Sequence, residues 1–322
     1  MGIPSQLATI LLREHAYRLI GGKILCIGRQ TVNLTPDTAL GLVERELGFR
    51  PRMPPLEIDH ATRAAGDGLI TDRAFFSLFS GAEYNCLDIS GYEGANIIAD
   101  LCQPLPAGLE EGFDFIVEGS CLDNLFDPAA AIRNLARLLK PDGRIVLFER
   151  ASRVHHVYLA YSLAWFHDYF AVNDFADCQV YLVQWENLVR GRWDLYHYSP
   201  AMTRDGEMRY FGQDRYHFPF RDAHALVIAE KQAASTWSRT PVQYQYRPDA
   251  PWRSEGGQPD LGWLSLPEHA TDPYFRSAAR FARSSRPNLL HPAEAVTLPD
   301  QFFHYDPQVA YCGSLSPFPA ED

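Results

Sequence analysis

Three kinds of feature are missing from this 322-residue chain: a long apolar run, a cluster of basic residues and a CxxC pair of cysteines. A membrane-spanning helix needs about 20 apolar residues in a row, and an export signal needs a basic start followed by an apolar stretch. Neither occurs, so we expect a cytoplasmic protein without a membrane partner. The net charge of −11 comes with scattered Lys and Arg residues, which offer no phosphate-neutralising surface. We therefore expect no nucleic-acid partner.

The cysteines show no spacing that would suit a metal. They are Cys26, Cys86, Cys102, Cys121, Cys178 and Cys312. Two of them, Cys26 and Cys86, lie in apolar, strand-like runs, which is typical of buried reduced thiols. The sequence therefore predicts no metal site.

What the chain does contain is a clear strand, helix and strand in succession between Gly112 and Arg150. The apolar run Phe113–Val117 reads as a buried parallel strand, and Pro128 suits the first turn of a helix. Lys140–Gly143 then provides a turn into a second apolar run, Arg144–Phe148. The residues that recur at helical spacing between the two runs are Ile132, Leu135, Ala136, Leu138 and Leu139.

The rest of the chain alternates in the same way. Further strands are expected at Lys23–Ile27, Tyr84–Leu87, Asn96–Ala99, Cys178–Trp185 and Ala223–Glu230. Helices are expected at Ser5–Ile20, Pro36–Leu47, Asp72–Phe79 and His155–Phe170. This alternation predicts an α/β fold with a doubly wound, mostly parallel sheet, and a hairpin-like pair at one edge.

The composition changes near residue 231. We expect one domain over residues 1–231 and an irregular extension, rich in proline and aromatic residues, over residues 232–322. One helix, Tyr274–Arg283, is predicted in the extension. Because it is too aromatic for a solvated linker, the extension is expected to pack on the domain or on a partner subunit, which allows a homodimer.

Open parallel sheets bind ligands beyond the carboxyl ends of their strands, where the strand order reverses. This rule alone selects the segments that follow the predicted strands. They are Gly28–Gln30, Asp88–Ser90, Asp100 and Glu118–Ser120. We expect them to line one crevice.

Two segments resemble a known family. FDFIVEGSCLDNLFDPAAAIRNLARLLKPDGRIVLFER, from Phe113 to Arg150, resembles the region around strands four and five of class I S-adenosylmethionine (SAM) dependent methyltransferases. LDISGYEGANIIADL, from Leu87 to Leu101, and the loop Gly28-Arg29-Gln30 resemble a bacterial subgroup related to methyltransferase type 11. The resemblance implies a Rossmann-like sheet of seven strands, with a final antiparallel strand, and SAM as the cofactor.

The resemblance also implies roles at the crevice. In the family, the position of Asp88 accepts hydrogen bonds from the ribose hydroxyls, and that of Asp100 faces the adenine amino group. The position of Gly28 lets the backbone approach the methionine part of the cofactor. The cofactor-binding residues implied in this way are Gly28, Arg29, Gln30, Asp88, Ile89, Asp100, Leu101, Glu118, Gly119 and Ser120. The alternative for Asp88 is an acid that only caps the turn into Ser90-Gly91.

Methyl transfer from a sulfonium is an in-line displacement, and a hydroxyl or amine acceptor must also lose a proton to a base. We expect His156 or Asp123 to be that base. The alternative for His156 is a histidine packed in an aromatic helix. The side chains expected to contact the acceptor are Asn124, Tyr158 and Tyr161, and the acceptor is expected to be a small molecule or a sugar, methylated on oxygen or nitrogen.

Two other functions are weighed against this one. A nicotinamide-dependent oxidoreductase needs G-x-G-x-x-G and an acid about 20 residues later, but only Gly28 is present here. The second alternative is a non-catalytic methyltransferase-fold protein that acts as a binding or regulatory subunit. The sparse glycines of the first loop favour it, and the acids Asp88 and Asp100 argue against it.

Overall fold

The structure, a computed structural model, describes residues 2–52, 55–152, 157–198, 222–242, 272–286, 289–290 and 309–318. Its helices are α1 (Ser5–Tyr17), α2 (Pro36–Leu47), α3 (Asp72–Ser77), the short 3-10 helix η1 (Leu122–Asn124), α4 (Pro128–Leu138), α5 (Leu163–Val172) and α6 (Asp272–Ala282). Its strands are β1 (Gly2–Ile3), β2 (Lys23–Ile27), β3 (Thr31–Val32), β4 (Glu83–Asp88), β5 (Ile97–Ile98), β6 (Phe113–Glu118), β7 (Leu139–Arg150), β8 (Asp177–Trp185), β9 (Trp193–Tyr198), β10 (Asp222–Glu230) and β11 (Val309–Leu315). None of these helices has the length and apolarity needed to cross a membrane.

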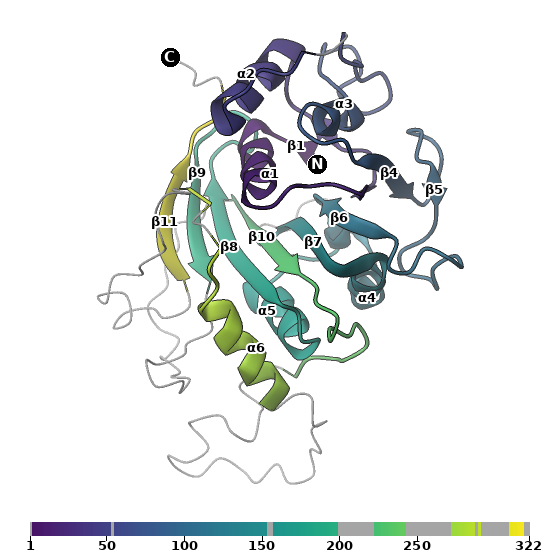
Figure 1. The fold of residues 1–322 in the computed structure, drawn as a ribbon, viewed down its shortest axis with the longest axis vertical. Coiled ribbons are helices and arrows are strands. Elements are labelled where there is room, and N and C mark those ends of the chain that lie inside the picture. The colour runs from purple at the N-terminus through teal and green to yellow at the C-terminus, as the bar shows by residue number, and fades with distance from the viewer. Residues whose placement is uncertain are drawn as a thin grey trace.

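A large twisted sheet forms the centre of the molecule (Figure 1). In the described residues its strand order is β11-β9-β8-β10-β7-β6-β2-β4-β5. The five strands from β7 to β5 are parallel, whereas β10 is antiparallel to both β7 and β8. The chain continues from β2 to β4 on one side and from β6 to β7 on the other. The strand order therefore reverses between β2 and β6, which is where such sheets bind ligands.

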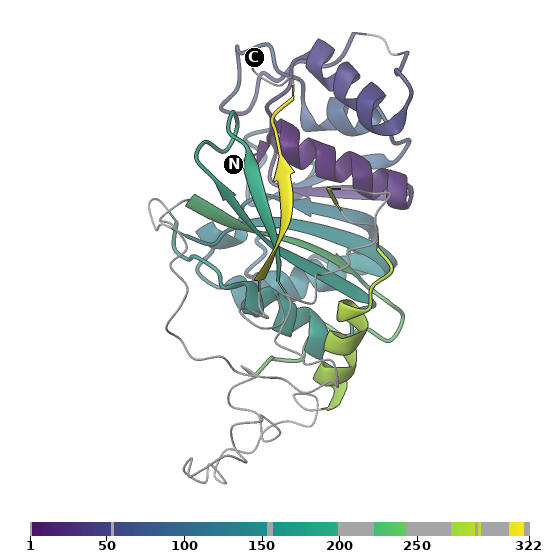
Figure 2. The same cartoon turned by 90° about the vertical axis from the view of Figure 1, so that its left-hand side faces the viewer.

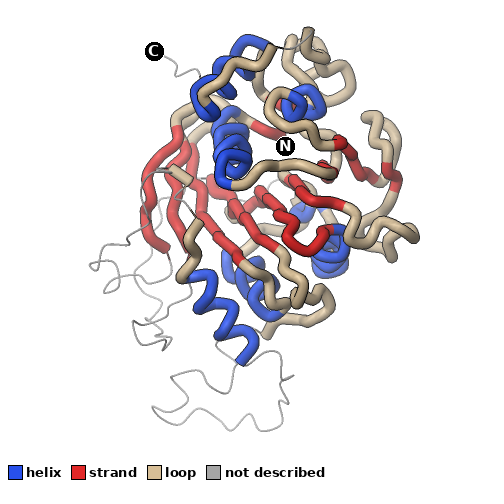
Figure 3. The backbone as a smooth tube through the Cα atoms, in the orientation of Figure 1, coloured by secondary structure: helices blue, strands red, loops and turns tan. Residues whose placement is uncertain are grey.

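Helices cover both faces of the sheet (Figures 2 and 3). Helices α1, α2 and α3 pack on one face, and α4, α5 and α6 pack on the other. Successive residues of a strand point to opposite faces, and β6 shows the result. Phe115 and Val117 join the core beneath α1, while Ile116 joins the core beneath α4. Both faces are buried, which explains the continuous apolar runs of the parallel strands.

The structure confirms the predicted fold class, an α/β architecture around a mostly parallel sheet, but the sheet has nine described strands where seven were expected. The two additional strands, β9 and β11, extend the antiparallel edge. Their sequences, WDLYHY and VAYCGSL, contain polar residues and a glycine that weaken a strand pattern. The expected final antiparallel strand is present as β10.

Two local predictions need correction. The aromatic helix begins at Leu163 rather than at His155, so Tyr158 and Tyr161 precede it. The backbone N–H of Tyr158 donates to the carbonyl of Asp123 (2.8 Å), which holds this part of the chain away from a helical path. The Lys140–Gly143 segment is an irregularity inside β7, where the pairing register with β6 shifts.

The described parts of the C-terminal segment contact the rest of the chain. Helix α6 packs on α5 and β8, and β11 pairs with β9. The buried guanidinium of Arg286 donates to both carboxylate oxygens of Glu14 in α1 (2.7 and 2.6 Å) and to Asp177 at the start of β8 (3.0 Å). A domain boundary at residue 231 and a homodimer formed through this segment stay predictions.

Candidate functional site

The segments selected from the sequence lie together at the carboxyl ends of the parallel strands. The N–H of Gly28 donates to the carbonyl of Leu87 (2.8 Å), and the N–H of Ala99 donates to that of Asp88 (2.9 Å). The ends of β2, β4 and β5 are thus joined side by side. Gly28 has a φ of 65°, a conformation that side chains disfavour, and a Cβ there would lie 3.5 Å from Asp88 Oδ2.

The two acids near these strand ends are held in place by their own turns. Oδ1 of Asp88 accepts the N–H of Ser90 (3.2 Å), and Oδ1 of Asp100 accepts the N–H of Cys102 (2.8 Å). Both side chains are half-buried. No described residue donates to Oδ2 of Asp88, so this acid keeps one acceptor for a bound group, whereas the Asp100 carboxylate also has the Cys102 thiol within hydrogen-bond reach. Beside them, Ile89 is exposed and Leu101 is buried.

Asp72, at the start of α3, fixes the loop after β2. This fully buried carboxylate accepts hydrogen bonds from Arg29 Nε (2.9 Å), the N–H of Gln30 (2.8 Å) and the hydroxyl of Tyr84 (2.6 Å). Burial lowers the pKa of Arg29, but the negative charge of Asp72 offsets this and the net shift is upward. Arg29 also donates to the carbonyl of Glu93 (3.1 Å). The Gly28-Arg29-Gln30 loop and the YEGA segment are therefore parts of one structure.

Gln30 connects the tips of β2 and β6. Its Nε2 donates to the carbonyl of Ile27 (2.7 Å), whereas its Oε1 is buried and lacks a donor among the described residues. That oxygen lies 3.9 Å from where a Cβ of Gly119 would be, and Phe148 Cβ lies 3.4 Å from the same point. An acceptor without a partner beside a glycine suits a bound group that brings an N–H donor.

Three fully buried acids lie at or near the ends of β6 and β7: Glu118, Asp123 and Glu149. Glu149 accepts the backbone N–H groups of Cys121 (3.2 Å), Leu122 (3.1 Å) and Asp123 (3.0 Å), which begin η1. Burial raises the pKa of both Glu118 and Glu149. Among the described residues, no group of His, Cys, Asp or Glu side chains has the geometry to hold a metal ion.

The candidate base Asp123 is itself held by two neighbours. Its oxygens accept hydrogen bonds from Ser120 Oγ (2.9 Å) and Asn124 Nδ2 (2.6 Å). Burial raises the pKa of its carboxyl, so the group holds a proton more readily than an exposed aspartate. Its role as a base stays a prediction. The other candidate, His156, lies outside the described residues.

The predicted acceptor contacts divide into exposed and buried groups. Asn124 is exposed, and Tyr158 is 66% exposed and meets the 89%-exposed Phe126 edge to face, with ring centroids 5.9 Å apart. Tyr161 is buried instead, and its hydroxyl donates to the carbonyl of Leu122 (2.8 Å). The structure thus brings Asn124, Phe126 and Tyr158 together at the surface, with Tyr161 behind η1.

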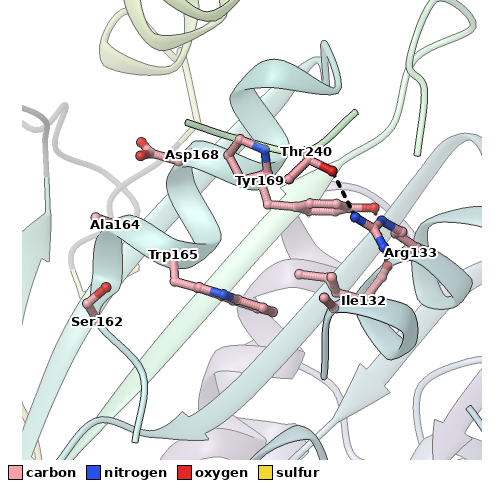
Figure 4. Close-up of a pocket in the computed structure, with 10 residues that line it drawn as sticks. Ile132, Arg133, Ser162, Ala164, Trp165, Asp168, Tyr169 and Thr240 are labelled. Carbon is pink, nitrogen blue, oxygen red and sulfur yellow. Dashed lines mark hydrogen bonds between the residues drawn. The ribbon is translucent and has the colours of Figure 1, made fainter. Parts of the chain in front are cut away.

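A cleft of about 450 Å³ opens between the first turns of α4 and α5 (Figure 4). Trp165 and Tyr169 of α5 face Ile132 and Arg133 of α4, and Arg133 donates to Thr240 Oγ1 (2.9 Å). These helices follow β6 and β7, so the cleft lies toward the edge of the sheet where those strands end.

Four residues of this site were missed in the sequence: Asp72, Tyr84, Phe126 and Glu149. Asp72 looks like an ordinary acid in the first turn of a helix, and Glu149 looks like the polar end of a strand. Their contacts join segments far apart in the chain, which periodicity does not reveal. One signal was available for Glu149: acids are seldom fully buried, so an acid that follows an apolar strand run points to a special role.

A family model described as a methyltransferase domain matches residues 66–147. The matched segment contains β4, β5, β6 and α4, and with them Asp88, Asp100 and Glu118. It ends before α5 and begins after β2, so Gly28 lies outside it. A search of curated proteins found none that matches the chain.

Solved structures give more distant likenesses. The CMeT domain of the citrinin polyketide synthase is 14% identical with a TM-score of 0.37, and the match covers 70% of this chain and 52% of that one. Phosphoethanolamine N-methyltransferase 2 of Haemonchus contortus, in complex with phosphomonomethylethanolamine and S-adenosylhomocysteine, is 13% identical with a TM-score of 0.37. That match covers 71% of this chain and 54% of the other. This chain thus spans about half the length of both structures.

A third likeness is to 1,6-didemethyltoxoflavin-N1-methyltransferase of Burkholderia thailandensis, whose structure holds 1,6-didemethyltoxoflavin and S-adenosylhomocysteine. It is 11% identical with a TM-score of 0.29, and the match covers 70% of this chain and 76% of that one.

Proposed function

We propose that this protein, an enzyme with a methyltransferase domain and S-adenosyl-L-methionine as its cofactor, methylates a hydroxyl or amine of a small-molecule or sugar acceptor. The observation that carries the proposal is the shared edge of β2, β4, β5 and β6. There a glycine with positive φ adjoins Asp88, and Asp100 lies two residues beyond the end of β5, the next strand. This edge coincides with the reversal of strand order, where such sheets bind nucleotides and related groups.

The residues at this edge fit the parts of SAM. The second carboxylate oxygen of Asp88 would accept from the ribose hydroxyls, and that of Asp100 from the adenine amino group. The backbone at Gly28 allows close approach, and Gln30 Oε1 offers an acceptor to the amino group of the methionine part. When bound, SAM supplies an electrophilic methyl group on a sulfonium.

The protein's own contribution is to orient the acceptor and exclude water. Asn124 and Phe126 follow β6, and Tyr158, which follows β7, is held beside them by its hydrogen bond to Asp123. The acceptor would rest on the exposed rings with its nucleophilic atom toward the cofactor. An exposed aromatic pair of this kind suits an acceptor with an apolar face. Asn124, whose amide is held by Asp123, would orient the acceptor by a hydrogen bond.

The Tyr158→Ala variant tests this arrangement. We expect it to lower kcat/KM for methyl transfer by about tenfold or more, because it removes half of the aromatic pair, while the affinity for S-adenosylhomocysteine stays within about twofold. Transfer would be followed with SAM carrying a labelled methyl group and a panel of small hydroxyl, amine and sugar compounds. Phe49→Ala, which removes an exposed ring beyond α2, serves as the matched control.

Binding and turnover separate the proposal from its alternative. If the wild-type protein binds S-adenosylhomocysteine but methylates no compound of the panel, the non-catalytic alternative is favoured. If it does not bind S-adenosylhomocysteine at millimolar concentration, the cofactor assignment also fails.

A further inference from the structure

One carboxyl group accepts hydrogen bonds from the turn that carries Asp123 and Asn124. Glu149, near the end of β7, accepts three successive backbone N–H groups, those of Cys121, Leu122 and Asp123. It is fully buried, so these bonds are shielded from water. A carboxylate that collects several N–H groups at the start of a helical turn fixes that turn in one position.

A second buried carboxyl group lies against the first. Glu118, at the end of β6, is fully buried, and no described residue donates a hydrogen bond to either of its oxygens. Glu118 pairs with Leu147 of β7, so Glu149, two residues further along that strand, lies on the same face of the sheet beside Glu118. This placement brings a hydrogen bond between the two carboxyl groups within reach. Two ionised carboxylates have no proton to share, so this bond exists only when one of the two groups is protonated.

The charges around the pair favour the protonated state. The titratable or charged groups near it are Cys121 and Asp123 on the turn, Tyr161 before α5, Arg150 at the end of β7 and Asp88 at the end of β4. Burial raises the pKa of Glu149 most, followed by the charge of Glu118 and a hydrogen bond with it, and then by the charge of Asp123. Arg150 acts chiefly on Asp123, where it lowers the pKa against the effect of burial.

We propose that Glu118 and Glu149 are positioning residues that share one proton, and that this proton keeps the turn Cys121–Asn124 in the geometry that presents Asn124 to the acceptor. With the proton in place, Glu118 donates to Glu149, and the charge of Glu149 stays on the three N–H groups. Without it, two negative charges face each other in a buried site, and the turn has to move. The catalytic consequence rests on the proposed function, but the shared proton does not.

The direction of the pH effect follows from the raised pKa values. Glutamates of the unfolded chain ionise near pH ~4.3, whereas the folded pair keeps a proton above that pH. The folded state therefore binds more protons, so the stabilising contribution of the pair is complete below the unfolded pKa. It is lost as the pH rises through the folded pKa. Stability conferred by the pair should thus decline from about pH 5 toward alkaline pH.

Glu118→Gln gives the sharpest test, because a glutamine amide donates permanently to Glu149 and needs no added proton. At pH 6 we expect the wild type to release about one proton more per molecule on unfolding than this variant does, as measured from the pH dependence of urea unfolding. Infrared spectra should show the band of a protonated carboxylic acid in the wild type at pH 7 and its loss in the variant. Glu83→Gln, on the exposed start of β4, is the matched control and should change neither readout.

Methyl-transfer activity provides a second test of the proposal. Between pH 7 and 9, Glu118→Gln should lose a smaller fraction of its own pH 7 activity than the wild type loses. Glu149→Gln, which removes the charge from the three N–H groups, should lower kcat by tenfold or more with S-adenosylhomocysteine affinity within about twofold. If Glu118 had only a structural role, its replacement by glutamine would not reduce the loss of activity between pH 7 and 9.

The outcomes separate the two proposals. Equal proton release and an unchanged infrared band in Glu118→Gln would refute the shared proton, whatever the activity. If proton release and the infrared band change as expected but the loss of activity between pH 7 and 9 is the same in Glu118→Gln and the wild type, the pair does not position the turn for catalysis. The infrared titration of the wild type alone decides the first point even if a variant fails to fold. Loss of S-adenosylhomocysteine binding in the wild type would instead refute the proposed function.

Discussion

Asp88→Ala should weaken the binding of S-adenosylhomocysteine by about 100-fold. The carboxylate of Asp88 is fixed by the N–H of Ser90 through one oxygen, and its second oxygen is available at the tip of β4. Hydrogen bonds to a charged group contribute about 1.5–3 kcal/mol each, and about 1.4 kcal/mol corresponds to a factor of ten. The loss of one or two such bonds to the ribose hydroxyls gives the expected change, which isothermal titration calorimetry would measure.

The matched control for Asp88→Ala is Asp67→Ala, since Asp67 is also an aspartate near glycines but is exposed and does not follow a strand of the sheet. It should leave the affinity unchanged. Asp88→Asn should fall between the two, because the amide keeps one acceptor oxygen but loses the charge. Equal affinities for the wild type and Asp88→Ala would show that Asp88 only caps its turn.

Arg286→Ala should lower the free energy of unfolding by about 3–5 kcal/mol. Arg286 is buried against Glu14 and Asp177, so its removal leaves carboxylates buried without their partner, and breaking a buried pair costs this much. Burial lowers the pKa of Arg286, but these carboxylates more than offset this, and its charge is retained. Urea unfolding at pH 7 would measure the change.

Arg283→Ala is the control, because Arg283 is exposed only three residues away. It should change the free energy of unfolding by less than about 0.5 kcal/mol. Arg286 and Asp88 lie near opposite ends of the strands. Asp177 pairs with Glu230 of β10, which pairs in turn with Arg144 near the amino end of the parallel strand β7, whereas Asp88 is at the carboxyl end of β4. Arg286→Ala should therefore keep its affinity for S-adenosylhomocysteine under conditions where it is folded. A loss of less than 1 kcal/mol would mean that the C-terminal segment adds little to the stability of the fold.

Much of the parallel half of the sheet was predictable because its signals are local. The bounds of β2 and α2 match the sequence-based expectation. Helix α2 has a capping threonine, a proline at its first turn and Gly48 in the left-handed conformation at its end. The apolar runs of β4 and β6 were found for a similar reason, because burial on both faces leaves no polar alternation to confuse the pattern.

The antiparallel edge was harder to predict because its pairing is not local. Strand β11 lies over a hundred residues beyond its partner β9, and a bulge occurs between Tyr311 and Gly313. The candidate site divides in the same way. Gly28, Asp88 and Asp100 follow from strand ends, whereas the contacts of Asp72 and Glu149 depend on which segments the fold brings together.

The tips of β2, β4, β5 and β6 form, we propose, one site for SAM. A crystal structure of the protein with S-adenosylhomocysteine tests it most directly. We predict that the ribose hydroxyls lie within hydrogen-bond distance of Asp88, that the adenine lies beside Asp100, and that the sulfur points toward Asn124 and Tyr158. A ligand bound elsewhere, or side chains filling the space between Gly28 and Asp100, would contradict the claim.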